Sequence, residues 1–256
     1  MVIVMITFIN YMNYSLSVII PVYMEAENIR DAVKGAMKAT ENAGIKEYEI
    51  IIIDCLRKDG SHDGTPDIAD EIASITPKVR VIHNKSYVNL GYKYFQGVRN
   101  AKYDYVTWIP GDNENLPESI TETYKLIGKA DVVVPYTSNM EVRPFFRQAV
   151  SKFYTFINNL FFGLNLNYYN GLCVYKRNLL QAIPEITDSF AFAAEILIYS
   201  LKSGASYVEI PIKIKAHSSK RKSSAFNIKN IIGTIKAIIK LFWNVRIKKK
   251  RISVKK

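Results

Sequence analysis

Cysteine is scarce in this sequence: Cys55 and Cys173 are its only two among 256 residues. Two cysteines are too few for a disulfide scaffold, and these two lack the spacing of a metal site. They fit a reducing compartment, where we interpret both as small buried apolar side chains.

A long apolar run is also missing. The N-terminal stretch MVIVMITFINYMNY is apolar but well short of the ~20 residues that span a bilayer, and it lacks the charged start of a signal peptide. No other segment reaches spanning length. We therefore expect a soluble or peripheral protein in which residues 1–15 are an extension ahead of the first strand.

Acidic residues are absent from the last part of the chain. Between Ala216 and Lys256 there are thirteen Lys or Arg and no Asp or Glu. The residues before this tail carry 22 basic and 23 acidic groups, so the net charge of +12 belongs to the tail. A tail of this kind favours a polyanionic partner, either nucleic acid or an anionic lipid surface.

Runs rich in β-branched residues alternate with amphipathic patterns over the first half of the chain. We expect strands at 17–22, 49–53, 79–82, 105–109 and 131–135, and helices at 25–42, 65–75, 92–101 and 117–128. This alternation predicts an α/β fold with a mostly parallel central sheet and helices on both faces. Further along, we expect an aromatic helix at 144–162, a strand at 172–175, a helix at 189–202 and a strand at 206–210.

The tail contains the most regular helical pattern. Its apolar residues recur at helical spacing: Ile228, Ile231, Ile232, Ile235, Ile238, Ile239 and Phe242. Trp243 and a basic run, 246–251, follow. An amphipathic helix with a basic flank is typical of a helix that lies in the plane of a membrane. The alternative, an apolar face packed on the domain, leaves the basic run unexplained.

The tail does not favour nucleic acid as its partner. Its aromatic residues lie on the apolar helix face instead of alternating with the basic residues, as base stacking would require. We therefore expect 216–256 to be a basic segment with a membrane-surface helix, and an anionic membrane to be its partner.

Carboxylates follow three of the expected strands. Glu25 comes after the first, Asp54 and Asp59 after the second, and Asp112 and Glu114 after the fourth. Ligands of open α/β sheets bind at this edge, and gathered carboxylates repel one another unless a cation is present. Mg²⁺ and Mn²⁺ prefer carboxylate and phosphate oxygens. The pattern predicts a divalent cation that holds a diphosphate.

Four segments in a fixed order carry a resemblance to a known family. They are SVIIPVYMEAENI, DGSHDGT, GYKYFQGVRNAKYDYVTWIPGDNE and FAAEILIYSLKSGASYVEIPI. From Ser17 to about Ser224 the chain resembles family 2 glycosyltransferases, and within them the dolichol-phosphate-mannose-synthase-like and polyprenyl-phosphate sugar transferases. The resemblance implies a GT-A domain over 16–215. It also implies inverting transfer of a sugar from a UDP- or GDP-sugar to polyprenyl or dolichyl phosphate, by a peripheral protein on the cytoplasmic face of a membrane.

The same resemblance implies roles for individual residues of the donor site. The nucleoside pocket would contain Pro21, Tyr23, Glu25, Asp54 and Asp59. Asp112 and Glu114 stand where the family binds Mg²⁺ or Mn²⁺, with Asp112 also catalytic. Asp63 opens a helix, and we interpret it as an N-cap that only shapes its loop.

On the acceptor side, the resemblance places Glu195 at an acidic position near the acceptor. The residues that would bind the phosphate groups of donor and acceptor are Arg143, Arg147, Lys220, Arg221 and Ser223. His217 belongs to the same basic segment as the last three. The aromatic helix at 144–162 would guide the isoprenoid, although core packing would account for most of its rings.

The sequence also departs from the family pattern. The four residues 55–58 separate Asp54 from Asp59, which affects the base-binding assignment more than the fold. Met24 stands where Asn is common, Glu114 replaces an Asp, and 170–172 differs from the usual Ser-Gly-Phe.

Two alternative functions remain open. One is transfer to a hydroxyl of a surface glycan, which needs a base near pH 7 such as Glu195. The other is an inactive membrane-binding module on a GT-A fold. A lipid phosphate is already anionic and needs no strong base, which fits a sequence with three histidines.

Overall fold

The computed structural model describes residues 14–184, 191–215 and 228–252. These residues contain one seven-stranded sheet, in the order β3-β2-β1-β4-β6-β5-β7, in which β6 alone is antiparallel to its neighbours. The strands are β1 (Leu16–Pro21), β2 (Tyr48–Cys55), β3 (Val79–Asn84), β4 (Tyr105–Trp108), β5 (Val132–Thr137), β6 (Val174–Lys176) and β7 (Tyr207–Ile212). The expectation of a mostly parallel sheet is confirmed.

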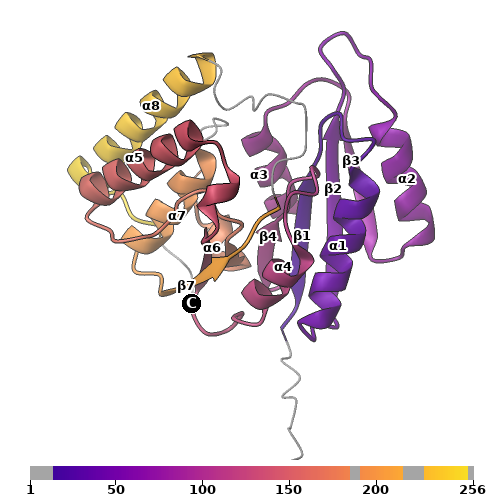
Figure 1. Cartoon of the computed structure of the whole chain (residues 1–256), viewed down its shortest axis with the longest axis horizontal. Helices are drawn as coiled ribbons and strands as arrows, with labels where there is room; N and C mark the ends of the chain where they lie inside the picture. Colours follow the sequence, from indigo (N-terminus) through magenta and orange to yellow (C-terminus); the bar gives the residue numbers. More distant parts are fainter. Residues whose placement is uncertain (1–13, 185–190, 216–227, 253–256) are drawn as a thin grey trace, which may run out of the picture.

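The helices lie on both faces of the sheet (Figure 1). They are α1 (Ile29–Asn42), α2 (Thr65–Ile75), α3 (Leu90–Asn100), α4 (Pro117–Tyr124), α5 (Phe145–Phe162), α6 (Arg177–Gln181), α7 (Phe192–Lys202) and α8 (Ile228–Phe242). A short 3₁₀ turn, Met140–Val142, precedes α5, and a π-helical turn, Trp243–Ile247, follows α8.

The alternation of side chains along the central strands builds two cores. Every residue of β1 and β2 is buried, because helices cover both faces of these strands. Ile50 and Ile52 pack with α1, α2 and α4, whereas Ile51 and Ile53 point the other way and pack with α3, α6, α7 and α8. The β-branched runs in the sequence thus correspond to a sheet that is covered on both sides.

Some element boundaries and elements differ from the expectations. The first helix begins at Ile29 instead of Glu25, because the carbonyl of Glu25 accepts the N–H groups of both Asn28 and Ile29 in a turn. The helix expected at 117–128 ends at Tyr124. The short helix α6 and the reversed direction of β6 were not expected, since β6 has only three residues and a weak pattern.

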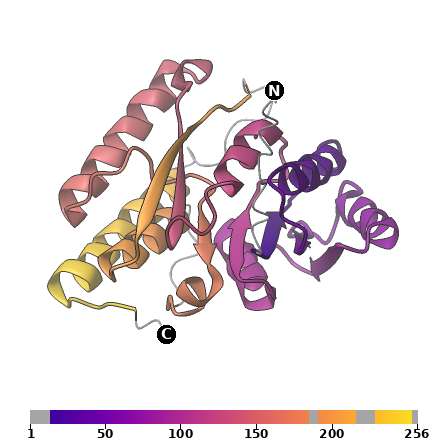
Figure 2. The same ribbon diagram turned by 90° about the horizontal axis from the view of Figure 1, so that it is seen from below.

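The helices α5 and α8 lie at one end of the molecule, and α1 and α2 lie at the other (Figure 2). The rings of Phe161 and Phe242 are 5.4 Å apart and bring the C-terminal ends of α5 and α8 together. Core packing does not account for most of the α5 rings: Phe145, Phe146, Phe153 and Phe156 are 60–83% exposed. That part of the expectation is wrong.

The apolar face of α8 is partly buried and partly exposed. Ala237, Ile238 and Leu241 are buried against the domain, whereas Ile235 and Ile239 are more than half exposed. The expected amphipathic helix is confirmed at 228–242. Within the described residues, no helix is both long enough and apolar enough to cross a membrane.

Candidate active site

The loop after β1 is tied to the loop after β2. The backbone N–H of Glu25 donates to the hydroxyl of Thr65 at 2.9 Å, and that of Ala26 donates to the Asp63 carboxylate at 3.2 Å. Asp63 also accepts the backbone N–H of Thr65. Asp63 therefore shapes the loops, as expected, but the N-cap of α2 is Gly64, one residue later, whose φ of 95° suits glycine.

Tyr23 lies beside a second tyrosine and a buried lysine. Its ring meets that of Tyr87 edge to face at 5.3 Å, and the Lys93 Nζ lies 5.6 Å from the Tyr23 ring centre. Lys93 is only 3% exposed, and its ammonium donates to the carbonyl of Val22 at 2.7 Å and lies 3.5 Å from the Cys55 Sγ. This ammonium links the ends of β1 and β2 below the loop that carries Tyr23.

Sequence analysis missed Lys93. Burial lowers the pKa of its ammonium from the ordinary lysine value. The signal was a lysine directly beside the apolar stripe of α3, which includes the buried Tyr94 and Val98. A lone lysine in a helix usually points to solvent, so the pattern alone did not single it out. Pro21, the last residue of β1, is buried as well.

Asp54 and Asp59 lie in different surroundings. Asp54 is 2% exposed, and its carboxylate bonds the His83 Nδ1 at 2.9 Å, while the His83 Nε2 bonds Asp70 at 3.0 Å. Burial opposes protonation of His83, but the hydrogen bonds to both carboxylates raise its pKa above the ordinary value.

Asp59 lies in the exposed loop between β2 and α2. It accepts the backbone N–H of Ser61 at 3.0 Å and the Ser61 hydroxyl at 2.7 Å, and these bonds lower the pKa of Asp59. The inserted residues 55–58 separate it from Asp54. Base binding by either aspartate stays a prediction.

The loop after β4 carries the carboxylates of the expected metal motif. Asp112 accepts the backbone N–H of Glu114 at 3.1 Å across Asn113, whose φ is 57°. A side chain at Gly111 would come within 2.5 Å of Val22, and its Cβ would lie 3.6 Å from the Glu25 Cγ. Glycine therefore allows this loop to lie against the loop that carries Glu25.

The last residue before the basic tail is bound to the same loop. The Lys215 ammonium donates to the backbone carbonyl of Asn113 at 2.8 Å and to its side-chain oxygen at 3.1 Å. The backbone N–H of Lys215 donates to the Glu114 carbonyl at 3.1 Å. The expected phosphate-binding residues of the tail lie outside the described residues: His217, Lys220, Arg221 and Ser223.

The residues of this loop fit a divalent cation shared with a substrate. No group of three His, Cys, Asp or Glu side chains in the described ranges is placed to hold a metal by itself. Mg²⁺ is usually held by one or two carboxylates together with phosphate oxygens of the substrate. Asp112 and Glu114 are two carboxylates of this loop, and carboxylate oxygens are the hard ligands that Mg²⁺ and Mn²⁺ prefer. Metal binding by this pair stays a prediction.

A groove of about 770 Å³ runs between α5 and α8. Its lining includes Trp108, the last residue of β4, and Leu90, the first residue of α3. Further lining residues are Arg143, Phe146, Arg147, Val150, Ser151, Phe153, Tyr154, Ile157, Asn158, Phe161, Tyr168, Asn170, Phe192, Ala193, Ile231, Thr234, Ile235, Ile238 and Ile239. Most of this lining is apolar.

The residues around the groove differ between the two ends of α5. Arg143 and Arg147 lie near the start of α5, and Arg143 donates to the Tyr168 hydroxyl at 3.2 Å. At the opposite end of α5, the contact of Phe161 with Phe242 joins the two helices. The groove is thus cationic where α5 begins and apolar along its walls.

Glu195 is buried in the first turn of α7, beside Phe192 and Ala193 of the groove wall. Its carboxylate is close enough to Tyr154 to contribute to the raised pKa of that hydroxyl. The structure therefore places Glu195 behind the groove, and its expected role near the acceptor stays a prediction.

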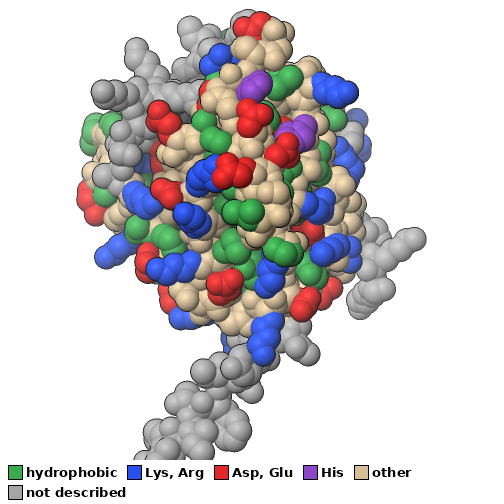
Figure 3. Space-filling model, turned by 90° about the vertical axis from the view of Figure 1, so that its right-hand side faces the viewer, with side chains coloured by type: hydrophobic (Ala, Val, Ile, Leu, Met, Phe, Trp, Pro, Cys, Tyr) green, Lys and Arg blue, Asp and Glu red, His purple; other side chains and the backbone are tan. Residues whose placement is uncertain are grey.

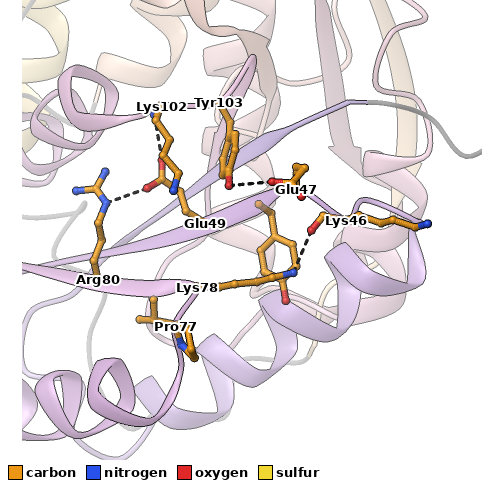
Figure 4. Close-up of a pocket in the computed structure, with 10 residues that line it drawn as sticks. Lys46, Glu47, Glu49, Pro77, Lys78, Arg80, Lys102 and Tyr103 are labelled. Atoms are coloured by element: carbon orange, nitrogen blue, oxygen red, sulfur yellow. Dashed lines mark hydrogen bonds and ion pairs between the residues drawn. The ribbon is translucent and has the colours of Figure 1, made fainter.

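A smaller pocket of about 170 Å³ lies at the opposite, amino-terminal edge of β2 and β3 (Figure 4). There Arg80 donates to the buried Glu49 at 2.8 Å, and Lys78 donates to the backbone carbonyl of Lys46 at 3.0 Å. Burial would raise the pKa of Glu49, but its hydrogen bonds lower it below the ordinary value. The polar groups of this pocket bond one another, as expected of a structural network.

Comparisons with known proteins agree with this geometry. The model of the family "Glycosyl transferase family 2" matches residues 17–183. Polyprenol monophosphomannose synthase of Mycolicibacterium smegmatis is 28% identical over 208 residues, covering 76% of this chain and 75% of that protein. An undecaprenyl-phosphate 4-deoxy-4-formamido-L-arabinose transferase of Edwardsiella ictaluri is 26% identical, covering 77% of this chain but 59% of the transferase.

Among solved structures, the glucosyl-3-phosphoglycerate synthase of Mycobacterium tuberculosis in complex with Mn²⁺, UDP-glucose and phosphoglyceric acid is similar to this chain. The TM-score is 0.61 at 15% identity, over 90% of this chain and 79% of that one. This likeness shows the GT-A fold. With a family match over more than half of its length, the chain belongs to glycosyl transferase family 2.

Proposed function

We propose that this glycosyltransferase moves a sugar from a UDP- or GDP-sugar to a polyprenyl or dolichyl phosphate at a membrane surface. The groove between α5 and α8 carries the proposal. Its walls match an apolar chain, and Arg143 and Arg147 match an anionic head group. The relatives named for polyprenol and undecaprenyl phosphate support the same acceptor class.

The donor would bind at the carboxyl edge of the sheet. Tyr23 and Glu25 would line the nucleoside pocket, with Pro21, Asp54 and Asp59 around it. Asp112 and Glu114 would hold Mg²⁺ or Mn²⁺, which when bound neutralises the charge on the leaving diphosphate. The glucosyl-3-phosphoglycerate synthase that shares the fold holds UDP-glucose and Mn²⁺ together, which supports this arrangement.

The reaction needs no strong base in this scheme. An oxygen of the acceptor phosphate attacks the anomeric carbon opposite the diphosphate, the new C–O bond forms, and the bond to the diphosphate breaks with inversion. Arg143 and Arg147 would orient the acceptor phosphate, and Lys220, Arg221 and Ser223 would complete the cationic surroundings of the diphosphate. Glu195 would act beside the acceptor.

The chain would reach its acceptor by lying on the cytoplasmic face of an anionic membrane. Exposed apolar side chains of α5 and α8, among them Phe156 and Ile239, would enter the lipid. The basic run after α8, 246–251, would face anionic head groups, at about 1 kcal/mol for each Lys or Arg near the surface.

The test is an acceptor panel assayed with the full-length protein, Mn²⁺ and radiolabelled UDP- and GDP-sugars. We expect label in undecaprenyl phosphate and none in undecaprenol, because the alcohol lacks the anion that the arginines bind. Label in an oligosaccharide acceptor but not in the lipid phosphate would contradict the proposal and favour the glycan-hydroxyl function. Absence of label in every acceptor would favour an inactive module.

A further inference from the structure

The residues directly after β7 lie against the loop of the expected metal motif. Ile214 forms a β-bridge with Asn115, and the backbone N–H of Lys215 donates to the Glu114 carbonyl at 3.1 Å. The Lys215 ammonium donates to the Asn113 carbonyl at 2.8 Å and to the Asn113 side-chain oxygen at 3.1 Å. The chain after β7 thus holds this loop at three consecutive positions.

Side chains from other parts of the fold fix the backbone ahead of Lys215. The Ser119 hydroxyl of α4 donates to the Lys213 carbonyl at 2.8 Å and accepts the Lys213 N–H at 3.1 Å. The Asn139 side chain donates to the Ile214 carbonyl at 2.9 Å and accepts the Ile214 N–H at 3.0 Å. Because none of these bonds uses the Lys215 side chain, a change of that side chain should leave the backbone of this stretch in place.

Asn113, the residue that the ammonium holds, has an uncommon backbone conformation. Its φ of 57° lies in the left-handed region, which asparagine tolerates better than most residues but which still costs conformational energy. Asn113 lies between the two carboxylates of the motif, and Asp112 accepts the backbone N–H of Glu114 across it at 3.1 Å. The backbone angles at Asn113 therefore decide how the two flanking carboxylates lie relative to each other.

The two bonds of the Lys215 ammonium favour this conformation. One ammonium can reach the carbonyl and the side-chain oxygen of the same residue only when these two oxygens converge, which restricts the torsion angles of Asn113. Hydrogen bonds from a charged donor are also stronger than those between neutral groups. Loss of the ammonium would allow the turn between Asp112 and Glu114 to relax.

We propose that Lys215 is a positioning residue for the divalent cation: its ammonium holds the turn at Asn113 in the conformation in which Asp112 and Glu114 can share one cation. Lys215 acts through the turn and not on the cation itself. Removing a group that orients metal ligands typically costs about 10–100-fold in metal affinity or activity. The inference rests on the proposed function, because it assumes that these two carboxylates hold Mg²⁺ or Mn²⁺.

The experiment measures binding of UDP and of GDP to the full-length protein by calorimetry, once with Mn²⁺ and once with EDTA. The ratio of the two affinities reports the contribution of the cation without any transfer activity. Lys215→Met removes the ammonium from a half-buried side chain. For whichever nucleotide the wild-type protein binds, we expect this variant to lower the ratio roughly tenfold or more and to leave the affinity in EDTA unchanged.

Lys213→Met is the matched control. Lys213 lies two residues earlier in the same stretch and is exposed, so the variant loses the same charge while the bonds to Asn113 stay. We expect its ratio to equal that of the wild type, and urea unfolding checks that each variant is folded. Asn113→Ala removes the side-chain acceptor instead and should lower the ratio in the same direction as Lys215→Met. In transfer assays, Lys215→Met should need more Mn²⁺ for half-maximal activity, and excess Mn²⁺ should restore the rate.

Three outcomes would overturn the inference and leave the proposed function standing. If Lys215→Met keeps the wild-type ratio, its ammonium does not position the metal ligands. If the variant loses affinity equally with Mn²⁺ and with EDTA, Lys215 acts on the nucleotide or on the fold. If Lys213→Met lowers the ratio as much, only the positive charge matters. A wild-type protein that binds UDP and GDP equally with Mn²⁺ and with EDTA, or that binds neither, would contradict the proposed donor site together with the inference.

Discussion

The helices α1 and α5 bury their side chains very differently. In α1, six of 14 residues are buried, whereas in the longer α5 only Asn158 and Phe162 of 18 are buried. Both helices have an apolar stripe in the sequence. The stripe of α1 completes a core, while that of α5 lines a groove and an exposed surface. An apolar helical pattern therefore predicts a helix but not what covers it.

Surface charge shows the same contrast. The face near α2 carries acidic and basic side chains interspersed with one another (Figure 3). Beyond α8, the run 246–251 carries basic residues without acidic ones. The α1–α2 end of the molecule thus has an ordinary solvated surface, and the α5–α8 end combines exposed apolar residues with positive charge.

Stability should depend on α1 far more than on the exposed face of α5. Ile29 is fully buried, so Ile29→Ala should lower the free energy of unfolding by about 2–5 kcal/mol. Phe156 is 60% exposed, and Phe156→Ala should change it by about 0.5 kcal/mol or less. Urea unfolding of both variants checks this. Similar losses for both would mean that the α5 face is covered in solution, for example by a second copy of the chain.

Membrane binding, unlike stability, should depend on the exposed face of α5. Phe156→Glu should weaken binding to vesicles of phosphatidylglycerol and phosphatidylcholine roughly 10- to 100-fold, because a buried aromatic contributes about 1.5–3 kcal/mol. Ile75→Glu, on a 73% exposed position of α2, is the control and should bind like wild type. Vesicle co-sedimentation measures both. Equal binding of Phe156→Glu and wild type would remove α5 from the membrane surface.

Hydrogen bonds that should respond to acid join the amino ends of β5 and β7 to the last residue of β6. Asp131 accepts from Lys176 at 2.8 Å and from the Ser206 hydroxyl at 2.7 Å, and these bonds lower its pKa to about 2. A lowered pKa stabilises the fold above pH 3.8, and this contribution is lost as pH falls towards 2.

Asp131→Asn should therefore cost about 1 kcal/mol at pH 7, after allowance for solvent screening of a partly exposed pair. Urea unfolding at pH 7 and pH 3 measures the cost. The difference between wild type and variant should shrink at the lower pH, and a difference that stays constant with pH would contradict the assignment.

A small stabilising effect is expected in the loop after β1. Met24 has a φ of 58°, a left-handed conformation that asparagine tolerates better than methionine. Met24→Asn should raise the free energy of unfolding by about 0.5–1 kcal/mol. Thermal unfolding checks this, with Met37→Asn in α1 as a control that should not stabilise. A loss of stability in Met24→Asn would show that the Met24 side chain makes contacts that outweigh the strain.

The sequence was most informative where one pattern has one structural meaning. The runs around Ile19 and Ile51 predicted strands buried on both faces, and the structure confirms them. The carboxylates Asp112 and Glu114 were expected in the loop after the fourth strand, where they lie. In these cases the residue type, its spacing and its place at a strand end all point to the same role.

The remaining features depend on distant parts of the chain. Lys93 reads as a solvated lysine until the fold places its ammonium against Val22. Tyr154 and Asn158 read as part of an apolar helix, and only the groove between α5 and α8 shows that they face a cavity. The partner of Asp54 is His83, 29 residues later, and no local pattern predicts that pair.

The central claim is that the nucleotide-sugar binds at the carboxyl edge of the sheet and that the lipid phosphate binds in the groove between α5 and α8. The most direct test follows transfer of label from a nucleotide-sugar to undecaprenyl phosphate by wild type, Asp112→Ala and Asp67→Ala, an exposed aspartate of α2, with Mn²⁺ and then with EDTA. We expect lipid-linked label with one nucleotide, lost at least ~100-fold in Asp112→Ala or EDTA and retained in Asp67→Ala. Equal transfer by Asp112→Ala and wild type, or no lipid-linked label with any donor, would contradict the account.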